Sequence, residues 1–327
     1  MDYMEIERLT ARVKAENGIV SLIKNEIAKV IVGQDALVDR MVIAFFCDGH
    51  ILLEGLPGLA KTLSVRSFSK SLDLAFSRIQ FTPDLLPADL TGTQIYNPRE
   101  MSFAVRKGPV FTNILLADEI NRAPAKVQSA LLQAMEERLV TIGESTFSLP
   151  RPFMVLATEN PIEQEGTYPL PEAQLDRFFM KCLISYPSAD EEKQILRRHD
   201  SRTVESISPV VDLKALDAAK KTVESIYVDE KLVEYIVAIV RATREPGKAD
   251  VAKFVEFGAS PRASIALMKA ARCIAFIRGR GFVTPDDIKE IALDILRHRV
   301  VLSYEAEAAG VTNDDVVTRI VEGVEVP

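Results

Sequence analysis

Short apolar runs alternate with stretches of helical periodicity through the first 187 residues of the chain. The apolar runs lie at residues 50–55, 74–81, 113–119, 153–160 and 178–187. Each run is nearly continuous and is bounded by turn-forming residues, which is typical of strands buried on both faces of a parallel sheet. Helical spacing is clearest between the third and fourth runs, at Val127, Ala130, Leu131, Ala134 and Met135. This alternation predicts an α/β fold.

The pattern changes after residue 187, where nearly all of the remaining chain has helical periodicity. Two of these helices begin with a capping residue followed by proline, at Ser260-Pro261 and Thr284-Pro285. We therefore expect an N-terminal helical arm, an α/β core with a mostly parallel sheet, and a smaller all-helical domain, at residues 1–30, 31–187 and 188–327.

Two segments within the predicted core have the pattern of β-hairpin insertions. Residues 82–111 contain TQIYN and SFAVRKG, which could pair as two strands. Residues 138–153 form a second candidate, which turns near Gly143-Glu144.

The composition is that of an ordinary globular protein, with 47% apolar and 27% charged residues. No apolar run approaches the roughly 20 residues that a bilayer requires, and the acidic, amphipathic N-terminus is unlike a secretory signal. We expect a cytoplasmic protein without a membrane span.

The three cysteines and three histidines show no metal-ligand spacing. A formal charge of −7 argues mildly against nucleic acid as the main partner.

The first predicted strand leads directly into EGLPGLAKT, residues 54–62, and then into a predicted helix. A strand–loop–helix unit directs backbone N–H groups and the positive end of a helix at one point, which suits a polyphosphate. Lys61 would add a charge at the β- and γ-phosphates of ATP, and Thr62 a hydroxyl ligand for Mg²⁺. The predicted nucleotide-binding residues are Gly55, Pro57, Gly58, Leu59, Ala60, Lys61, Thr62 and Leu63.

Ala60 stands where the pattern G-x-x-x-x-G-K-S/T has its second glycine. We expect a negative φ at Ala60, where alanine costs little, and a positive φ at Gly55 and Gly58 in the tight turn. On this view the extra methyl perturbs the loop without closing it. The alternatives are a decayed site or a chance match.

Polar side chains end two more of the predicted strands. Asp118 and Glu119 end the third, and in an open α/β sheet that edge is where ligands bind. Asp118 would hold Mg²⁺, directly or through water, and Glu119 would orient and deprotonate the attacking water. Asn160 ends the fourth strand and could position the water or contact the γ-phosphate. The alternatives are an acidic turn and an amide that caps the turn before Pro161.

Several motifs occur together in this order along the chain. They are IVGQ (31–34), LEGLPGLAKT (53–62), RIQFTPDLLPADLTG (78–92), KGPVF (107–111), LLADEINRAPAKVQSALLQAMEE (115–137), ATENP (157–161), LPEAQLDRF (170–178) and GASPRA (258–263). In this combination the chain resembles the MoxR family of AAA+ ATPases over nearly its whole length. MoxR proteins also carry GLAKT, so Ala60 departs from the general pattern but not from that of this family.

The resemblance implies a role for each site residue. Lys61 and Thr62 match Walker A, Asp118 and Glu119 match Walker B, and Asn160 matches sensor 1. The segment Val32, Gly33 and Gln34 resembles the one that lies against adenine.

Two arginines carry the remaining implied roles. Arg177 resembles the arginine finger, which reaches the γ-phosphate held by a neighbouring subunit, and Arg262 resembles sensor 2, which brings the helical lid onto the same phosphate. For Arg177 the alternative is a salt bridge to Asp176 or a nearby acid, and for Arg262 a surface position in the first turn of its helix. Arg122 is a second candidate for the trans contact.

The resemblance also implies a function. MoxR proteins are regarded as Mg²⁺-dependent ATPases that assemble as rings, expected here to be hexamers, and act as chaperone-like factors. They remodel or activate client proteins, assist metal-centre insertion, and often work with partners that carry a von Willebrand A-type domain. The two hairpins resemble the helix-2 insert and the pre-sensor-1 hairpin of the clade that includes magnesium chelatase, and they are candidates for moving parts.

Two other functions stay open. A nucleic-acid motor would carry basic and aromatic residues at its hairpin tips. TIGEST near Gly143 argues against this, whereas Arg99, Arg106 and Lys107 in the first insertion keep it possible. A non-catalytic nucleotide-binding scaffold would explain Ala60 but not the otherwise intact set of site residues. An enhancer-binding activator is disfavoured because GAFTGA is absent from the sequence.

Overall fold

The computed structural model describes residues 3–161, 167–200, 206–245 and 251–327. Its centre is a five-stranded sheet in the order β2-β5-β8-β1-β9, and every pairing within it is parallel. The strands are β1 (Ile51–Gly55), β2 (Phe76–Gln80), β5 (Ile114–Asp118), β8 (Met154–Glu159) and β9 (Met180–Ile184). One strand lies within each of the five predicted apolar runs, so the predicted α/β core is confirmed.

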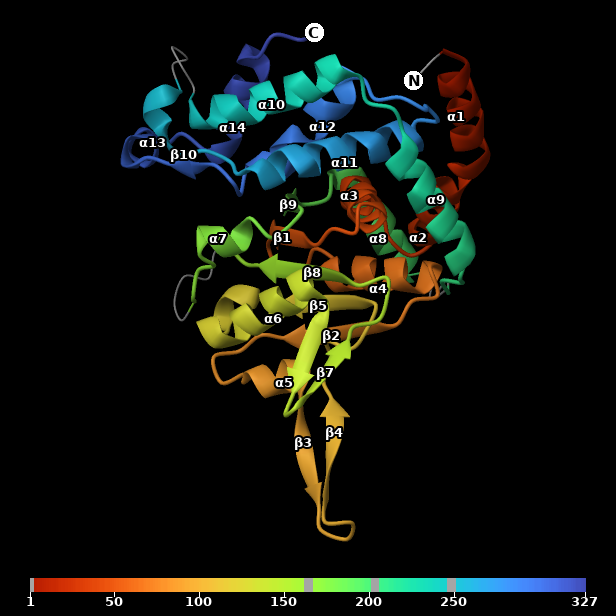
Figure 1. Cartoon of the computed structure of the whole chain (residues 1–327), viewed down its shortest axis with the longest axis vertical. Helices are drawn as coiled ribbons and strands as arrows, with labels where there is room; N and C mark the ends of the chain where they lie inside the picture. The colour runs from red at the N-terminus through yellow and green to blue at the C-terminus, as the bar shows by residue number, and fades with distance from the viewer. Residues whose placement is uncertain (1–2, 162–166, 201–205, 246–250) are drawn as a thin grey trace.

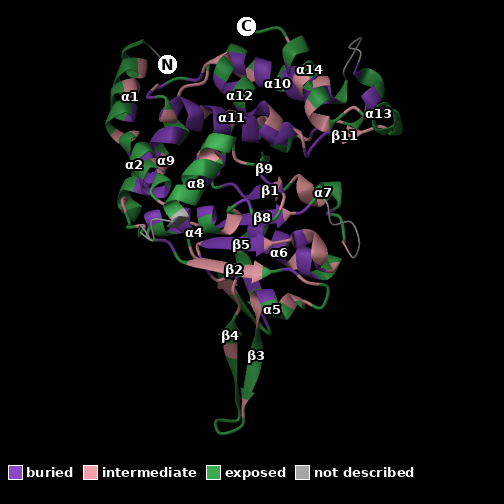
Figure 2. Ribbon diagram, turned by 180° about the vertical axis from the view of Figure 1, so that it is seen from behind, coloured by how far each residue is buried: buried purple, intermediate pink, exposed green. Residues whose placement is uncertain are grey.

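Alternate residues of the inner strands enter two separate hydrophobic clusters, which explains why the runs are apolar throughout. In β1, Ile51 and Leu53 belong to one cluster and Leu52 to the other. The first cluster also takes side chains from α2 (Gly18–Ala28), α3 (Asp35–Phe46) and α4 (Lys61–Ser71). The second takes them from α6 (Ala125–Glu137) and α5 (Pro87–Thr91). Helices therefore cover both faces of the sheet, whose buried strands appear purple in Figure 2.

The N-terminal residues form two helices that pack against the rest of the chain. Helix α1 (Tyr3–Glu16) buries Val13, and α2 contributes Ile23 and Ile27 to the first cluster. The hydroxyl of Thr10 accepts a hydrogen bond from the N–H of Gly281 at 3.1 Å. The helices predicted for the arm are present, and they bridge the α/β core and the C-terminal helices (Figure 1). The three domain boundaries stay a prediction.

The C-terminal region is helical, as predicted. Its helices are α8 (Ala189–Asp200), α9 (Leu213–Ser225), α10 (Glu230–Arg244), α11 (Pro261–Ile277), α12 (Pro285–Leu296), α13 (Tyr304–Ala309) and α14 (Asn313–Gly323). Ser260 and Thr284 are the N-caps of α11 and α12, as their positions directly before a proline predict. The structure adds one short antiparallel ribbon, β10 (Val255–Phe257) with β11 (Val301–Leu302). The remaining short helices are α7 (Glu172–Leu175), η1 (Ile120–Arg122) and η2 (Ala252–Phe254).

Both predicted hairpins are present. Strands β3 (Gly92–Asn97) and β4 (Ser102–Lys107) form an antiparallel ribbon that projects from the body of the molecule (Figure 1). Strands β6 (Leu139–Ile142) and β7 (Ser145–Ser148) turn at Gly143, as expected. The turn of the β6–β7 hairpin meets β3 near the base of the other hairpin, since a Cβ on Gly143 would lie 2.2 Å from the side-chain amide of Gln94.

The backbone of the predicted phosphate-binding loop, residues 54–62, corrects two expectations. Ala60 is the N-cap of α4 and has φ +56° and ψ +18°, in the left-handed region rather than at the negative φ predicted. Gly58 has φ +85°, as expected. Gly55 is instead the last residue of β1, and it is close to β9, because a Cβ there would lie 2.9 Å from the Cβ of Ile184. The loop thus turns through two left-handed residues, of which one is alanine.

We predict that Ala60→Gly raises the free energy of unfolding by about 0.5–1 kcal/mol. Relief of the left-handed strain on an L-residue outweighs the extra freedom that glycine gives the unfolded chain. Urea denaturation measures the change. Ala218→Gly is the matched control, because Ala218 is exposed within α9, where glycine costs about 1 kcal/mol. A loss of stability at both positions would contradict the left-handed conformation of Ala60.

His50, which directly precedes β1, is buried and neutral. Its Nδ1 accepts a hydrogen bond from the N–H of Val155 at 3.0 Å, and its Nε2 lies 3.2 Å from the carbonyl oxygen of Met135. An acceptor at Nδ1 and a donor at Nε2 define one neutral tautomer, which joins β8 to the end of α6. Burial lowers the pKa of His50 from 6.5 to about 4.

This pKa predicts a loss of stability in mild acid. Above pH 6.5 His50 is neutral in both states, whereas between 6.5 and about 4 only the unfolded chain binds the proton. The free energy of unfolding should therefore fall across that window, by about 3 kcal/mol for this one group. Urea denaturation at a series of pH values measures it. In His50→Asn, whose amide oxygen can replace Nδ1 without titrating, the slope should be shallower; an unchanged slope would contradict the assignment.

Candidate functional site

A cavity of about 400 Å³ opens where β1, β5 and β8 end. We call it the phosphate cavity, because the predicted phosphate-binding loop lines it. Its lining consists of the loop and first turn of α4, residues from β2, and the polar ends of β5 and β8; the residues are Pro57, Gly58, Leu59, Ala60, Lys61, Thr62, Leu63, Arg78, Gln80, Asp118, Glu119, Thr158 and Asn160. The predicted loop, acidic pair and Asn160 are therefore brought together. Because the strands are parallel, their carboxyl ends must meet at one edge of the sheet.

Lys61 is positioned by its own loop. Its Nζ donates a hydrogen bond to the carbonyl oxygen of Gly55 at 2.6 Å. Burial lowers the pKa of Lys61, while the negative charges of Asp118 and Glu119 act in the opposite direction. The ammonium group is thus held within the cavity, beside the acidic pair. Gly55 itself is not part of the cavity lining and contributes through its carbonyl group.

Thr158 fixes the two carboxylates relative to each other. Its hydroxyl donates to Oδ1 of Asp118 at 2.7 Å and accepts from the N–H of Glu119 at 2.8 Å. Glu119 has φ +57°, a strained backbone conformation for this residue type. Such strain is typical of functional sites and persists only where neighbouring groups impose it, as Thr158 does here. Sequence reasoning missed Thr158, although a polar residue inside an apolar run was a usable signal.

The edge strand β2 supplies two further partners of the acidic pair. Arg78 donates from Nη2 and Nε to Oδ2 of Asp118, at 2.6 and 3.0 Å, and Gln80 donates from Nε2 to Oε2 of Glu119 at 2.7 Å. Nε of Arg122 lies 3.1 Å from the same oxygen of Glu119. These contacts were also missed from sequence, since alternating polar residues on an edge strand usually indicate a solvent-facing side.

The donor set of this cavity fits a magnesium ion that is shared with a nucleotide. Mg²⁺ prefers oxygen ligands and is commonly held by one or two carboxylates together with substrate phosphates and water. Asp118 and Thr62 supply a carboxylate and a hydroxyl here. Within the described residues, no group of three or more His, Cys, Asp or Glu side chains could hold a metal alone. Asp118 would have to exchange its pairing with Arg78 for the ion.

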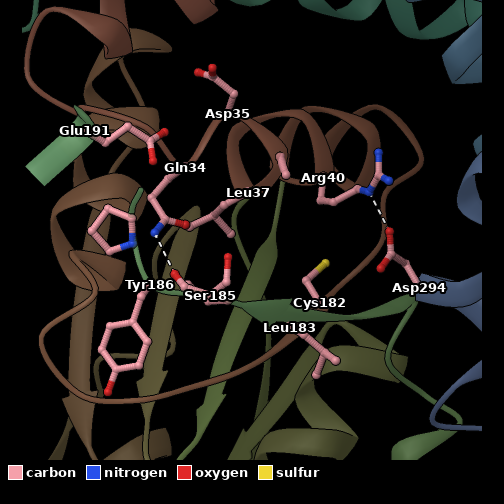
Figure 3. A pocket seen from close by; sticks show the side chains of 13 residues that line it. Gln34, Asp35, Leu37, Arg40, Cys182, Leu183, Ser185, Tyr186, Glu191 and Asp294 are labelled. Carbon is pink, nitrogen blue, oxygen red and sulfur yellow. Dashed lines mark hydrogen bonds and ion pairs between the residues drawn. The ribbon is translucent and has the colours of Figure 1, made fainter. Parts of the chain in front are cut away.

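A second cavity of about 350 Å³ lies beside the end of β9, at the same edge of the sheet (Figure 3). It is lined by Gln34, by Ser185 to Pro187 and by Glu191, and the amide of Gln34 donates to the carbonyl oxygen of Ser185 at 3.4 Å. Gly33 has φ +68°, and a Cβ there would lie 2.4 Å from the carboxylate of Glu191. In the segment predicted to contact adenine, Gln34 lines this cavity. Val32 and Gly33 directly precede Gln34 in the sequence.

Arg177 and Arg262 lie at the opposite edge of the sheet. Arg177 lies just before β9, at the amino end of that strand. There the N–H of Phe179 donates to the carbonyl oxygen of His50, which directly precedes β1, so this is the amino edge of the sheet. The two strands are five residues long, so the edges are about 16 Å apart. Nε of Arg177 lies 3.2 Å from one oxygen of Glu136, and Nη2 of Arg262 lies 2.9 Å from the other. The predicted arginines are thus together, but away from the phosphate cavity of their own chain.

The salt-bridge alternative for Arg177 is present with a nearby acid and not with Asp176, because Glu136, at the end of α6, is its partner. The adjacent Asp176 pairs instead with Arg299, at 2.8 Å, and with Arg262, at 3.5 Å. Arg177 and Arg262 nevertheless expose 34% and 50% of their side chains. Both guanidinium groups are therefore accessible to a second molecule. Arg122, the other trans candidate, lies beside Glu119 at the phosphate cavity.

Comparison with known proteins places the chain in a family. The model of the ATPase family associated with various cellular activities (AAA) matches residues 50–180, and that of the AAA lid domain matches residues 247–320. Chaperone MoxR1 of Mycobacterium tuberculosis is 49% identical over 92% of this chain and 81% of its own. Protein MoxR of Methylorubrum extorquens is 32% identical over 93% and 94% of the two chains.

A solved structure agrees with this assignment. The crystal structure of a protein from Cytophaga hutchinsonii superimposes with a TM-score of 0.91 at 46% identity, covering 99% of both chains. Family models, sequence relatives and fold thus lead to the same conclusion. The chain belongs to the MoxR family of AAA+ ATPases, with an AAA domain followed by an AAA lid.

Proposed function

We propose that this protein hydrolyses ATP with Mg²⁺ and that each catalytic site is completed by an adjacent subunit. One observation carries the proposal: the phosphate cavity and the paired arginines lie at opposite edges of the same sheet. An arginine side chain cannot span the roughly 16 Å between these edges. Arg177 and Arg262 can therefore serve only a nucleotide that is bound to another copy of the chain.

Within one subunit, the residues of the phosphate cavity have separate roles in ATP hydrolysis. Lys61 and the N–H groups at the start of α4 hold the phosphates, and Asn160 contacts the γ-phosphate or the water. The carboxylate of Glu119 orients a water molecule for attack on the γ-phosphorus and accepts its proton, while ADP leaves. Thr62 and Asp118 would hold Mg²⁺, which neutralises charge on the β- and γ-phosphates. Val32, Gly33 and Gln34 lie against the base.

The neighbouring subunit supplies positive charge to the transferring phosphoryl group. An arginine in this role contributes about 10³–10⁵ in rate. The contact is heterologous, since the carboxyl edge of one subunit meets the amino edge of the next, and such contacts generate rings when the rotation closes. A hexamer is the ring size that the family resemblance favours. The protein would act in the cytoplasm.

We propose that the work done is the remodelling or activation of client proteins, including help with metal-centre insertion. This rests on the family, of which one relative is named a chaperone, and a partner with a von Willebrand A-type domain is proposed on the same ground. The β3–β4 ribbon is a candidate client contact because Tyr96, Met101 and Phe103 are exposed on it. Lys107, one of three cations that suggested nucleic acid, lies over the rings of Phe111 and Phe147, which argues against that alternative.

Steady-state ATPase measurements test the shared site. Activity per subunit should rise with protein concentration, because the site forms only on assembly. Glu119→Gln should abolish turnover while ATP still binds, and Arg177→Ala should lower kcat by about 10³. Arg241→Ala, at an exposed arginine on α10, is the control and should leave turnover unchanged. Activity that is independent of both concentration and Arg177 would contradict the proposal.

A further inference from the structure

The carboxylate of Asp176 lies at the junction of three elements. Its Oδ1 accepts from Nε of Arg299 at 2.8 Å, and its Oδ2 accepts from the hydroxyl of Ser260 at 2.9 Å. Nη1 of Arg262 lies 3.5 Å from that same Oδ2. Arg299 follows α12, Ser260 caps α11, and Asp176 itself directly precedes Arg177. One carboxylate therefore connects the Arg177 loop to two lid helices.

Arg299 holds the main chain on both sides of Arg177. Besides the carboxylate, it donates to the carbonyl oxygens of Asp176 at 3.2 Å, Phe178 at 2.6 Å and Phe179 at 3.2 Å. Its side chain is only 3% exposed. A buried guanidinium with its donors satisfied and its charge paired forms a rigid connection, because moving it would leave an uncompensated charge. The backbone that presents Arg177 is thus fixed from the lid.

Ser260 connects the same carboxylate to Arg262. Its hydroxyl accepts from the N–H of Arg262 at 3.2 Å, as an N-cap, and donates to Asp176. The first turn of α11, which carries Arg262, is therefore tied to the residue next to Arg177. The two guanidinium groups converge on Glu136, the arrangement in which two cations would bind one anion.

We infer that Asp176 is a positioning residue that joins Arg177 and Arg262 into one unit, so that both reach a neighbouring subunit's γ-phosphate together. This inference rests on the proposed function. Asp176 does not touch the nucleotide; it acts by holding the loop before β9 and the start of α11 in one geometry. Its loss would impair catalysis in the adjacent subunit, while the phosphate cavity of its own subunit stays competent.

Complementation in mixed assemblies of the full-length chain tests this. Asp176→Asn keeps the size of the side chain but removes its charge, so kcat should fall at least about tenfold, equivalent to 1.4 kcal/mol. Binding of a non-hydrolysable ATP analogue should be unchanged. Mixing with Glu119→Gln subunits, inactive alone but with intact arginines, should restore turnover, because Asp176→Asn sites then receive arginines from the other variant. A merely misfolded subunit would not be rescued.

Two further variants make each outcome decisive. Ser260→Gly breaks the link to Asp176 at a capping cost of only a few tenths of a kcal/mol. It should show the same fall in kcat and the same rescue by Glu119→Gln subunits. If Asp176→Asn does not fold, Ser260→Gly tests the coupling in its place. Arg177→Ala mixed with Glu119→Gln tests the shared site itself. If that mixture recovers activity but the Asp176→Asn and Ser260→Gly mixtures do not, the coupling is refuted. If the Arg177→Ala mixture does not recover activity, the proposal that adjacent subunits share a site is itself refuted.

Discussion

The parallel direction of the five strands determines at which edge of the sheet the predicted site residues of the α/β core lie. Because all strands run the same way, the phosphate loop, the acidic pair and Asn160 meet at the carboxyl edge. The same geometry places the segment before β9, with Arg177, at the amino edge. One chain thus carries both halves of a proposed catalytic site, and the sheet keeps them apart.

Charged groups at both edges are paired within the chain. Arg78 pairs with Asp118, Arg122 with Glu119, and Arg177 and Arg262 with Glu136. In each pair the arginine side chain is between 34% and 50% exposed. Ion pairs that water reaches in this way contribute little to stability, about 0–1 kcal/mol each, so exchanging the partner for a phosphate or a metal ion costs little. The Asp176–Arg299 pair is different, because the Arg299 guanidinium is only 3% exposed and all of its donors are hydrogen-bonded. The charged groups at the two edges of the sheet can therefore exchange their partners, whereas the Asp176–Arg299 pair that supports Arg177 stays fixed.

Much of the fold follows from local signals in the sequence. The five apolar runs, both hairpins and the Ser260 and Thr284 caps are found where periodicity and turn chemistry predict them. The β10–β11 ribbon was missed because strands of three and two residues have no detectable alternation. The φ of Ala60 was mispredicted because alanine rarely adopts left-handed conformations, and only the geometry of the whole loop imposes one here.

The site was less predictable than the fold, because the contacts that organise it join residues far apart in sequence. Arg78 meets Asp118 across 40 residues, and Asp176 meets Arg299 across 123.

A structure of the assembled protein with Mg²⁺, ADP and aluminium fluoride would show directly whether adjacent subunits share a catalytic site. We expect Arg177 and Arg262 of one subunit to contact the fluoride group that is bound by the next subunit. Both arginines still on Glu136, with no neighbouring arginine at the nucleotide, would contradict it.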